Sequence, residues 1–315
     1  MKKILSIALA TVLCCSIWAQ QQPAVKGGSL ALAVYVEEPV EPFPAAAKTQ
    51  MTNKLTRLLI QNGVASSDYF GQFFITVQQV PQTKDVLPGP PMQIATTMEF
   101  TFYIADYYNQ LVFSTATVQA KGVGINEPKC YMDAIKHLNL NSKALQTFIA
   151  EGKAKIIDYY NAQADNMMLR TRNLARQKKF EEALFLMQSI PSECDKYEQA
   201  MALGNEVYQQ YVDYLCDRNL ALARTTWAAM QNAQGAAEAG EYLAQIYPEA
   251  KCYGEAMALY KEIKGKVLDD WKFEMKKYQD GVNLEQARIN AWREVGVAYG
   301  RGQQPVTTNI GFLGR

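Results

Sequence analysis

The sequence predicts an α+β sandwich domain followed by an all-α helical-repeat domain, and three observations support this order. The first residues of the 315-residue chain have the pattern of an export signal. Between residues 28 and 160, strand and helix patterns alternate, as they do where helices pack on one sheet. From Asp165 onward, strand patterns are absent and apolar residues recur at helical spacing. We therefore divide the chain into a signal peptide (1–19), an α+β domain (20–162), a domain of helical hairpins (163–300) and a flexible tail (301–315).

Residues 1–19 have the pattern of a secretory signal peptide. A short basic start precedes an apolar run over residues 4–13, which is too short to span a bilayer. Cys14 and Cys15 follow, but neither is preceded by the small residue that normally precedes a lipid-modified cysteine. We expect cleavage after Ala19 and a soluble, periplasmic or secreted bacterial protein.

The overall charge excludes nucleic-acid binding as the main function. The chain has 32 Lys and Arg against 31 Asp and Glu, and loss of Lys2 and Lys3 with the signal leaves a net charge of about −1. A basic excess that could neutralise phosphates is therefore missing. With 49% hydrophobic and 20% charged residues, the composition is that of a globular protein. No second apolar stretch is long enough to cross a membrane.

The first elements of the α+β domain are a strand, a helix and a second strand. Residues 29–36 form a compact apolar run that predicts a buried strand, which three prolines then end. The next segment places Met51 and several leucines on one helical face, and Gly63 favours the end of that helix. Residues 73–77 predict the second strand.

Residues 81–91 are rich in proline and glycine and predict a long exposed loop, because they suit neither a helix nor a central strand. Long exposed loops often carry binding residues, which makes Pro88 and Pro90 candidates for a binding surface. A solvated connection between two strands is the alternative interpretation.

A β-hairpin is expected after this loop. Residues 98–104 alternate apolar and polar side chains, and residues 111–120 form the returning strand. The turn between them contains Tyr107 and Tyr108, which we also regard as candidate binding residues.

Gly122 and Gly124 close the returning strand. They do not form a phosphate-binding loop, because the wider glycine pattern and a following Lys-Ser or Lys-Thr are missing. Helices are then expected over residues 128–138 and 142–160, with Gly152 as a weak point in the second.

Part of this domain resembles a family of bacterial envelope domains. Residues 52–63 (TNKLTRLLIQNG) are similar to the helix that follows the first strand in that family. Residues 100–106 and 118–124, followed by Ala134 and Ile135, resemble the hairpin, the Gly-x-Gly and the alanine-rich helix that end such domains. The family includes the curli-secretion outer-membrane component and the outer-membrane lipoprotein activators of penicillin-binding proteins. The resemblance implies a module of the cell envelope.

The second half predicts stacked helical hairpins. Residues 173–184 resemble the helix–turn–helix junction of tetratricopeptide-type repeats, where an aromatic residue seats the turn. Residues 186–201 are similar to residues 243–257, although their spacing differs from the standard repeat, which indicates irregular hairpins in a short solenoid. Three tryptophans at helical spacing are expected in the core: Trp227, Trp271 and Trp292.

The end of the chain predicts a last amphipathic helix and a mobile tail. Residues 266–278 are charged and amphipathic, which favours a solvated helix over a partner-binding one. In the glycine-rich tail, Phe312 and Leu313 are apolar and could become ordered on a partner, so they join the candidate binding residues.

The cysteines that remain after signal cleavage allow three full pairings. If residues 196–215 form one helix, Cys194 and Cys216 lie about 30 Å apart, beyond the reach of a disulfide. We expect residues 220–230 to run back along this helix and the next helix to return. That path places Cys252 beside Cys216, so the predicted bridge is Cys216–Cys252.

The sequence contains a single histidine, His137, which we expect on a helix surface. One histidine without a nearby ligand cluster argues against a zinc site and against a histidine-dependent triad. We therefore predict no metal, no cofactor and no catalytic residues, and hence no enzyme.

The leading hypothesis is an exported, non-enzymatic interaction or scaffold module in cell-envelope assembly or secretion. Its partners would be envelope proteins, and peripheral association with the outer membrane stays open. The alternative is a periplasmic glycan- or lipid-binding module that uses Tyr107, Tyr108 and the loop at residues 81–91. A hydrolase is the third hypothesis, although no spacing of carboxylates or nucleophiles supports it.

Overall fold

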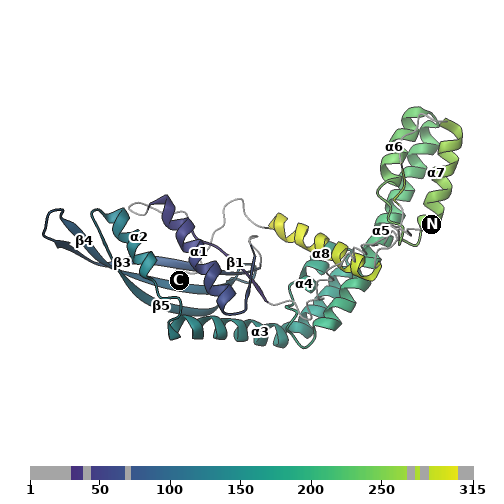
Figure 1. Cartoon of the computed structure of the whole chain (residues 1–315). Coiled ribbons are helices and arrows are strands. Elements are labelled where there is room, and N and C mark those ends of the chain that lie inside the picture. Colours follow the sequence, from purple (N-terminus) through teal and green to yellow (C-terminus); the bar gives the residue numbers. More distant parts are fainter. Residues whose placement is uncertain (1–29, 38–43, 68–71, 268–273, 277–283, 304–315) are drawn as a thin grey trace, which may run out of the picture.

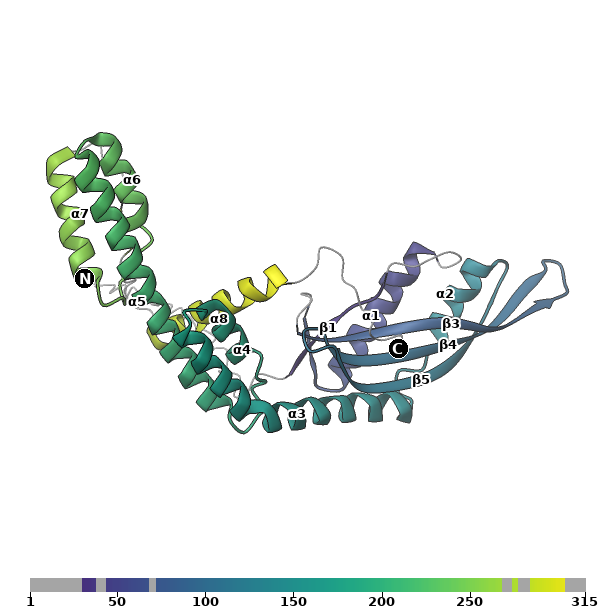
Figure 2. The same cartoon turned by 180° about the vertical axis from the view of Figure 1, so that it is seen from behind.

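The computed structural model describes residues 30–37, 44–67, 72–267, 274–276 and 284–303. The expected signal peptide, Trp271, Phe312 and Leu313 lie outside the described residues. Within these ranges, none of the helices combines the length and the apolarity that a membrane span requires. Figures 1 and 2 show an elongated molecule, with the sheet and its helices at one end and a small bundle of helices at the other.

The first half is built on one mixed sheet with the strand order β2-β1-β3-β4-β5. Strand β1 pairs in parallel with β2 and β3, whereas β3, β4 and β5 form an antiparallel meander. The strand bounds are β1 Ala31–Val34, β2 Ala65–Ser67, β3 Phe73–Leu87, β4 Gln93–Asp106 and β5 Leu111–Gly124.

Strand β3 corrects the predicted loop at residues 81–91. It continues through Pro81 and pairs with β4 as far as Leu87, opposite Gln93. Among the described residues, the short β1 pairs with β3 only at Phe74 and Ile75, and no other strand lies on this outer edge of β3. A proline is tolerated at such an edge because no ladder bond is lost there, and a register shift after Pro81 absorbs the irregularity. The actual loop spans only the residues between β3 and β4.

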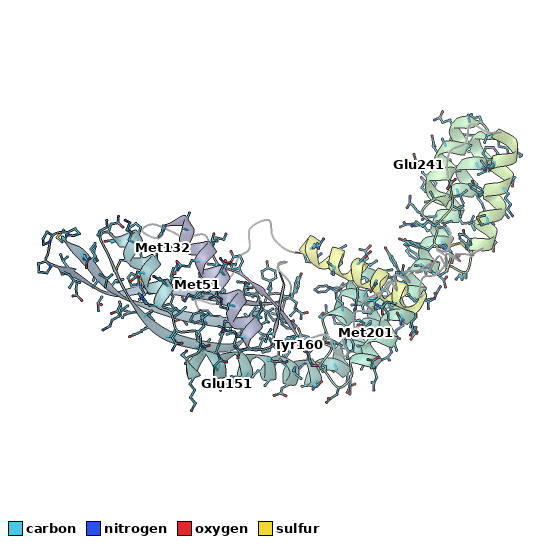
Figure 3. All side chains as sticks on the ribbon, in the orientation of Figure 1. Met51, Met132, Glu151, Tyr160, Met201 and Glu241 are labelled. Atoms are coloured by element: carbon cyan, nitrogen blue, oxygen red, sulfur yellow. A yellow bond between two sulfur atoms is a disulfide. The ribbon has the colours of Figure 1, made fainter. Side chains whose placement is uncertain are left out.

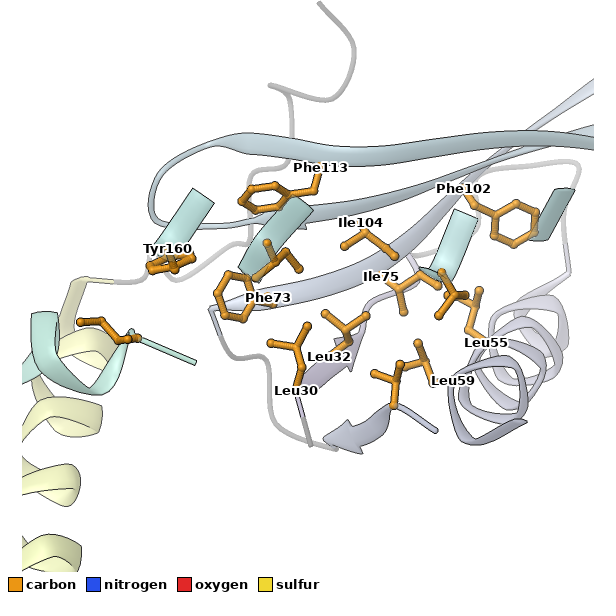
Figure 4. Close-up of a cluster of buried hydrophobic side chains, with 14 of the residues drawn as sticks. Leu30, Leu32, Leu55, Leu59, Phe73, Ile75, Phe102, Ile104, Phe113 and Tyr160 are labelled. Carbon is orange, nitrogen blue, oxygen red and sulfur yellow. The ribbon is translucent and has the colours of Figure 1, made fainter. Parts of the chain in front are cut away.

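Helices α1 (Ala45–Gln61), α2 (Glu127–His137) and α3 (Lys143–Arg176) enclose the core with this sheet. Apolar side chains alternate along β4, and they meet leucines of α1 in one continuous layer (Figure 4). Phe102 of β4 and Phe148 of α3 pack with their ring centroids 6.2 Å apart. The opposite sheet face is polar in its middle, where the hydroxyls of Thr101 and Thr117 lie 3.1 Å apart. The predicted α+β class of this half is confirmed.

The glycines at the end of β5 allow α2 to pack directly on the sheet. A Cβ at Gly122 would overlap the Cys130 carbonyl oxygen and would lie 2.9 Å from the Ala134 Cβ. A Cβ at Gly124 would lie 2.5 Å from the Cys130 nitrogen. The Gly-x-Gly pattern therefore serves close packing of a helix on a strand, and not anion binding.

Helix α3 is longer than the predicted helix over residues 142–160, and it passes through our expected domain boundary after residue 162. Its Gly152 lies against the sheet, where an added Cβ would be 2.5 Å from Ile104 Cδ1. Tyr160, which Figure 3 places where α3 leaves the sheet, donates a hydrogen bond to the buried Asp106 carboxylate at 2.5 Å. Burial, and then the Asp106 charge, raise the pKa of Tyr160.

The described residues of the second half form helices and their connections, which confirms the all-α prediction. It contains α4 (Phe180–Gln188), α5 (Tyr197–Met230), α6 (Ala233–Leu243), α7 (Tyr253–Val267) and α8 (Leu284–Gln303).

Helix α5 corrects the expected reversal after residue 215. The helix is continuous to Met230, because the sequence between Gly204 and Met230 contains neither glycine nor proline. Gln231 then adopts a left-handed conformation, and the side chain of Asn232 caps α6, so the chain reverses one segment later than predicted.

The predicted Cys216–Cys252 disulfide is present although the predicted path was wrong. Helix α6 runs back along the outer part of α5 and brings Cys252 to a Cα–Cα distance of 6.0 Å from Cys216. Cys130 and Cys194 are buried free thiols. Around the bridge, α5, α6 and α7 form a second core that is separate from the main one.

Helix α8 packs against α4 and α5 through the fully buried Trp292, as predicted for this residue. The ring lies over Gly204, where a Cβ would be 2.9 Å away, and the indole N–H donates to Asn205 Oδ1 at 3.0 Å. The helix predicted over residues 266–278 is not observed at residues 274–276, which have no regular structure, whereas residues 266–267 belong to α7 and the rest of the predicted helix lies outside the described residues. Residues 301–303, which we assigned to the flexible tail, belong to α8.

Replacing Gly122 by alanine is expected to lower the free energy of unfolding by about 1–3 kcal/mol, because the new methyl group must displace α2. Urea denaturation followed by circular dichroism measures this change. Gly265→Ala is the matched control, because no atom lies within 4 Å of its added Cβ. The control should be unchanged or up to about 1 kcal/mol more stable. Equal effects of the two substitutions would contradict the packing role of Gly122.

Removing the disulfide with Cys216→Ser and Cys252→Ser should destabilise the α5–α6–α7 end by about 4 kcal/mol, because the bridge closes a loop with a sequence separation of 36. Hydrogen exchange of α6 and α7 measures this loss. Dithiothreitol should weaken the wild-type protein in the same region and leave the double variant unaffected. Mass mapping of a non-reduced digest that finds both thiols free, or Cys194 joined to Cys216, would show the assignment to be wrong.

Candidate functional site

The end of the β3–β4 hairpin, residues 80–95, extends beyond the helices, and we call it the arm (Figures 1 and 2). Every residue from position 80 to position 93 is exposed. The base of the arm is braced, because Thr96 Oγ1 donates to the Thr83 carbonyl at 2.6 Å and Lys84 forms an ion pair with Glu127 at the start of α2. The arm is thus an ordered strand pair, and its side chains face solvent.

The arm and the adjoining end of β5 together carry most of the exposed large hydrophobic side chains of the described residues. Ten large hydrophobic residues are exposed among the described residues. Six of these ten lie on the arm or at, or just after, the adjoining end of β5. Met92 is 63% exposed and Val86 is 57% exposed. No charged residue occurs between Asp85 and Glu99. The six residues are Val80, Val86, Leu87, Met92, Val123 and Ile125.

A groove of about 790 Å³ lies between α1 and α2 beside the arm. Val123 and Ile125 belong to the six exposed hydrophobic residues and also line the groove, so the groove adjoins this set of apolar side chains. The side-chain oxygen of Gln50 is buried at the groove wall and has no hydrogen-bond partner among the described residues. Lys129 and Lys136 also line the groove, so it offers two cations beside apolar side chains.

The polar contacts of the groove hold α1 and α2 in place. Lys54 of α1 donates to the carbonyl oxygens of Lys136 and Leu138, at 2.8 and 3.1 Å, and thereby satisfies the end of α2. Burial, and then the nearby Arg57 charge, lower the pKa of Lys54. Asp133 accepts the backbone N–H of Val123 at 3.0 Å, which joins α2 to β5.

The structure separates the binding residues that the sequence suggested. Pro88 and Pro90 lie at the exposed tip of the arm, whereas Tyr107 and Tyr108 lie at the other end of β4. Because β4 contains 14 residues, the two groups are about 45 Å apart. Tyr108 packs against Phe185 of α4 with a ring-centroid distance of 4.8 Å, so it belongs to the contact between the two halves.

The described titratable groups do not gather into a metal-binding cluster: no group of three or more His, Cys, Asp or Glu could hold an ion there. His137 is exposed at the end of α2, as predicted, with Nδ1 3.3 Å from Asp133 Oδ2. The Cys130 thiol lies under the arm and donates to the Gly122 carbonyl at 3.0 Å. Burial raises its pKa, which keeps this thiol protonated and weakly nucleophilic.

Sequence reasoning missed Val86, Met92 and the groove residue Gln50. The missing charge between Asp85 and Glu99 was a usable signal for the arm, because an exposed hairpin normally carries charges on its edge. No comparable signal marks Gln50, whose position depends on the packing of α1 against α2.

Comparisons with known proteins place this chain in no family. No family model matches the sequence, and no curated protein is significantly similar to it. A minor lipoprotein from Acinetobacter baumannii is a structural neighbour with 16% identity and a TM-score of 0.26, covering 40% of this chain and 94% of its own. A second neighbour from Caulobacter crescentus CB15, described as a putative lipoprotein, has 10% identity and a TM-score of 0.21. The match covers 39% of this chain and 82% of the neighbour. At these TM-scores, neither likeness bears on the function of this chain.

The exposed methionine of the arm should contribute little to stability. Met92→Ala is expected to change the free energy of unfolding by less than about 0.5 kcal/mol. The same substitution at the fully buried Met98, on the same strand, should lower it by about 2–5 kcal/mol. Chemical denaturation of both variants measures the contrast, and similar losses would mean that the arm is part of the core.

Proposed function

We propose that this protein is an exported, non-enzymatic interaction module that docks through the arm and the adjoining groove onto a protein of the cell envelope. The observation that carries the proposal is the concentration of exposed apolar side chains on the arm and the adjoining end of β5. Soluble proteins rarely leave a contiguous apolar patch exposed unless it binds something. The export pattern of residues 1–19 supports an envelope location.

The chemistry of the arm favours docking through side chains over the addition of a strand. Pro88, Pro90 and Pro91 have no backbone N–H to donate, and Pro81 with its register shift interrupts the free edge of β3. Apolar anchors such as Met92 suit a pocket on a partner, which is how interface hot spots are usually built.

The groove adds a polar rim to this surface. Lys129 and Lys136 would donate to acidic side chains of the partner at the edge of the contact. An apolar centre with a polar rim is the usual anatomy of a protein–protein interface.

The non-enzymatic part of the proposal rests on the residues available for chemistry. The sequence has one histidine, which is exposed on α2. Burial raises the pKa of the two free thiols, to about 11 for Cys194, so neither is a ready nucleophile.

Lipid binding is the second candidate, and the charge-free stretch between Asp85 and Glu99 favours it. An uncharged apolar tip can enter the boundary between headgroups and acyl chains. The form of this hypothesis that combined Tyr107 and Tyr108 with the loop is not supported, because these residues lie at the opposite end of β4.

A pull-down from envelope extract tests the proposal with an arm variant, Val86→Asp and Met92→Asp. The wild-type protein should recover a stoichiometric partner, and the variant should recover at least about tenfold less, because two apolar anchors are lost. The matched control is Leu169→Asp with Leu222→Asp, which changes two leucines that are 55% and 41% exposed on the helical half. This control should bind as the wild type does.

Flotation with vesicles of phosphatidylethanolamine and phosphatidylglycerol separates the two candidates. Vesicle binding that the arm variant loses, without a protein partner, would favour the lipid-binding function. Equal recovery by wild type and arm variant would contradict both. Turnover of an envelope polymer would show the non-enzymatic part to be wrong.

A further inference from the structure

A second cleft, of about 470 Å³, lies in the helical half, where the turn between α3 and α4 faces α5 and α8. We call it the tyrosine cleft. It shares no residue with the arm or with the groove between α1 and α2. Its lining includes three cations and three tyrosines: Lys178, Lys179, Arg218, Tyr211, Tyr214 and Tyr299.

Aromatic rings form the walls of the tyrosine cleft. Tyr211 and Tyr214, from successive turns of α5, pack beside the buried Phe180, with ring centroids 5.7 and 5.6 Å from it. Tyr299 of α8 lines the cleft from a third helix. All three tyrosines are half-buried, so their rings are fixed in place while part of their surface stays accessible.

The acidic groups at the cleft already have partners. Glu181 accepts the Tyr211 hydroxyl at 3.2 Å, and Glu182 pairs with Arg170 at 3.0 Å. Burial, and then the Glu181 charge, raise the pKa of Tyr211 to about 12, so its hydroxyl stays neutral near pH 7. The negative charges of the lining are therefore engaged within the fold.

The cations of the cleft are less completely paired. Lys178 lies 5.1 Å above the Tyr214 ring, whereas Lys179 Nζ and the Arg218 guanidinium make no hydrogen bond or ion pair with described residues. Asp217, which precedes Arg218 in the sequence, forms an ion pair with Lys251, with 3.3 Å between Oδ2 and Nζ. The cleft thus presents unpaired positive charge beside aromatic walls.

We propose that the tyrosine cleft binds an acidic peptide segment in which a carboxylate lies next to an apolar side chain. The carboxylate would lie between Lys179 and Arg218, and the apolar side chain would stack on the tyrosine rings. Peptide N–H groups would find acceptors in the remaining carboxylate lone pairs of Glu181 and Glu182. A neutral sugar would leave both cations unpaired, and an acidic sugar would offer no apolar side chain to the rings.

This site goes beyond the proposed function, because it needs neither the arm nor the groove. Fluorescence anisotropy with a labelled Glu-Phe-Glu-Phe peptide tests it on the full chain. Saturable binding is expected, with a clear preference over the Gln-Phe-Gln-Phe isostere that weakens as salt is added. The arm variant should bind this peptide as the wild type does.

Lys179→Gln and Arg218→Gln should each weaken binding of the acidic peptide up to about fivefold, since each removes one exposed charge contact. Both should also reduce the preference over the isostere. Lys261→Gln is the matched control, because Lys261 is an exposed lysine of α7 outside the cleft, and it should have no effect. Far-UV circular dichroism confirms that each variant is folded.

Equal affinity for the two peptides, or no saturable binding, would overturn the proposal. Tighter binding of oligogalacturonate, with displacement of the peptide, would assign the cleft to an anionic glycan instead and would also overturn it. The pull-down with the arm variant tests only the proposed function, and the peptide measurement tests only the tyrosine cleft. Failure of one proposal can therefore be distinguished from failure of the other.

Discussion

The hydrogen bonds around the buried carboxylate of Asp106 are the interaction on which the arrangement of the two halves depends. Asp106 is fully buried and accepts the Tyr160 hydroxyl at 2.5 Å, the Asn109 backbone N–H at 3.0 Å and the Gln72 amide at 3.1 Å. A buried charge is tolerated only when such donors surround it, and losing one donor is costly. Tyr160 belongs to α3, so the network fixes this helix to the end of the sheet at the β4–β5 turn.

Because α3 continues past Tyr160 without a break, the same contact directs the helical half away from the sheet. Tyr108 at the turn contacts Phe185 of α4, and an added Cβ at Gly300 of α8 would lie 3.0 Å from the Tyr108 hydroxyl. The junction is therefore packed from both sides. It leaves the arm at one end of the sheet and helices α4 and α5 beyond the other end (Figure 1), so the tyrosine cleft, which these helices line, is separate from the arm.

Local patterns predicted most elements but not their extent. The alternation along β4, the helix that ends near Gly63 and the buried Trp292 follow from periodicity and end signals. Sequence reasoning missed the strand through Pro81. A proline is unfavourable only where its nitrogen would have to donate to a neighbouring strand, and the length of β1 decides whether β3 has such a neighbour at Pro81. Of the candidate site, the tip prolines were predicted, but the groove and the tyrosine cleft join distant segments that leave no local pattern.

The sequence by itself determined the α+β and all-α halves, the single histidine and the separation of Cys194 from Cys216 along one helix, because composition, hydrophobic period and helix rise are local properties. Only the tertiary structure decided which path brings Cys252 beside Cys216, that Gly122 admits α2, and that the suggested binding residues lie at opposite ends of β4. These features depend on which elements meet. Which elements meet is determined by the burial of apolar surface over the whole chain. A short window of sequence does not contain this information.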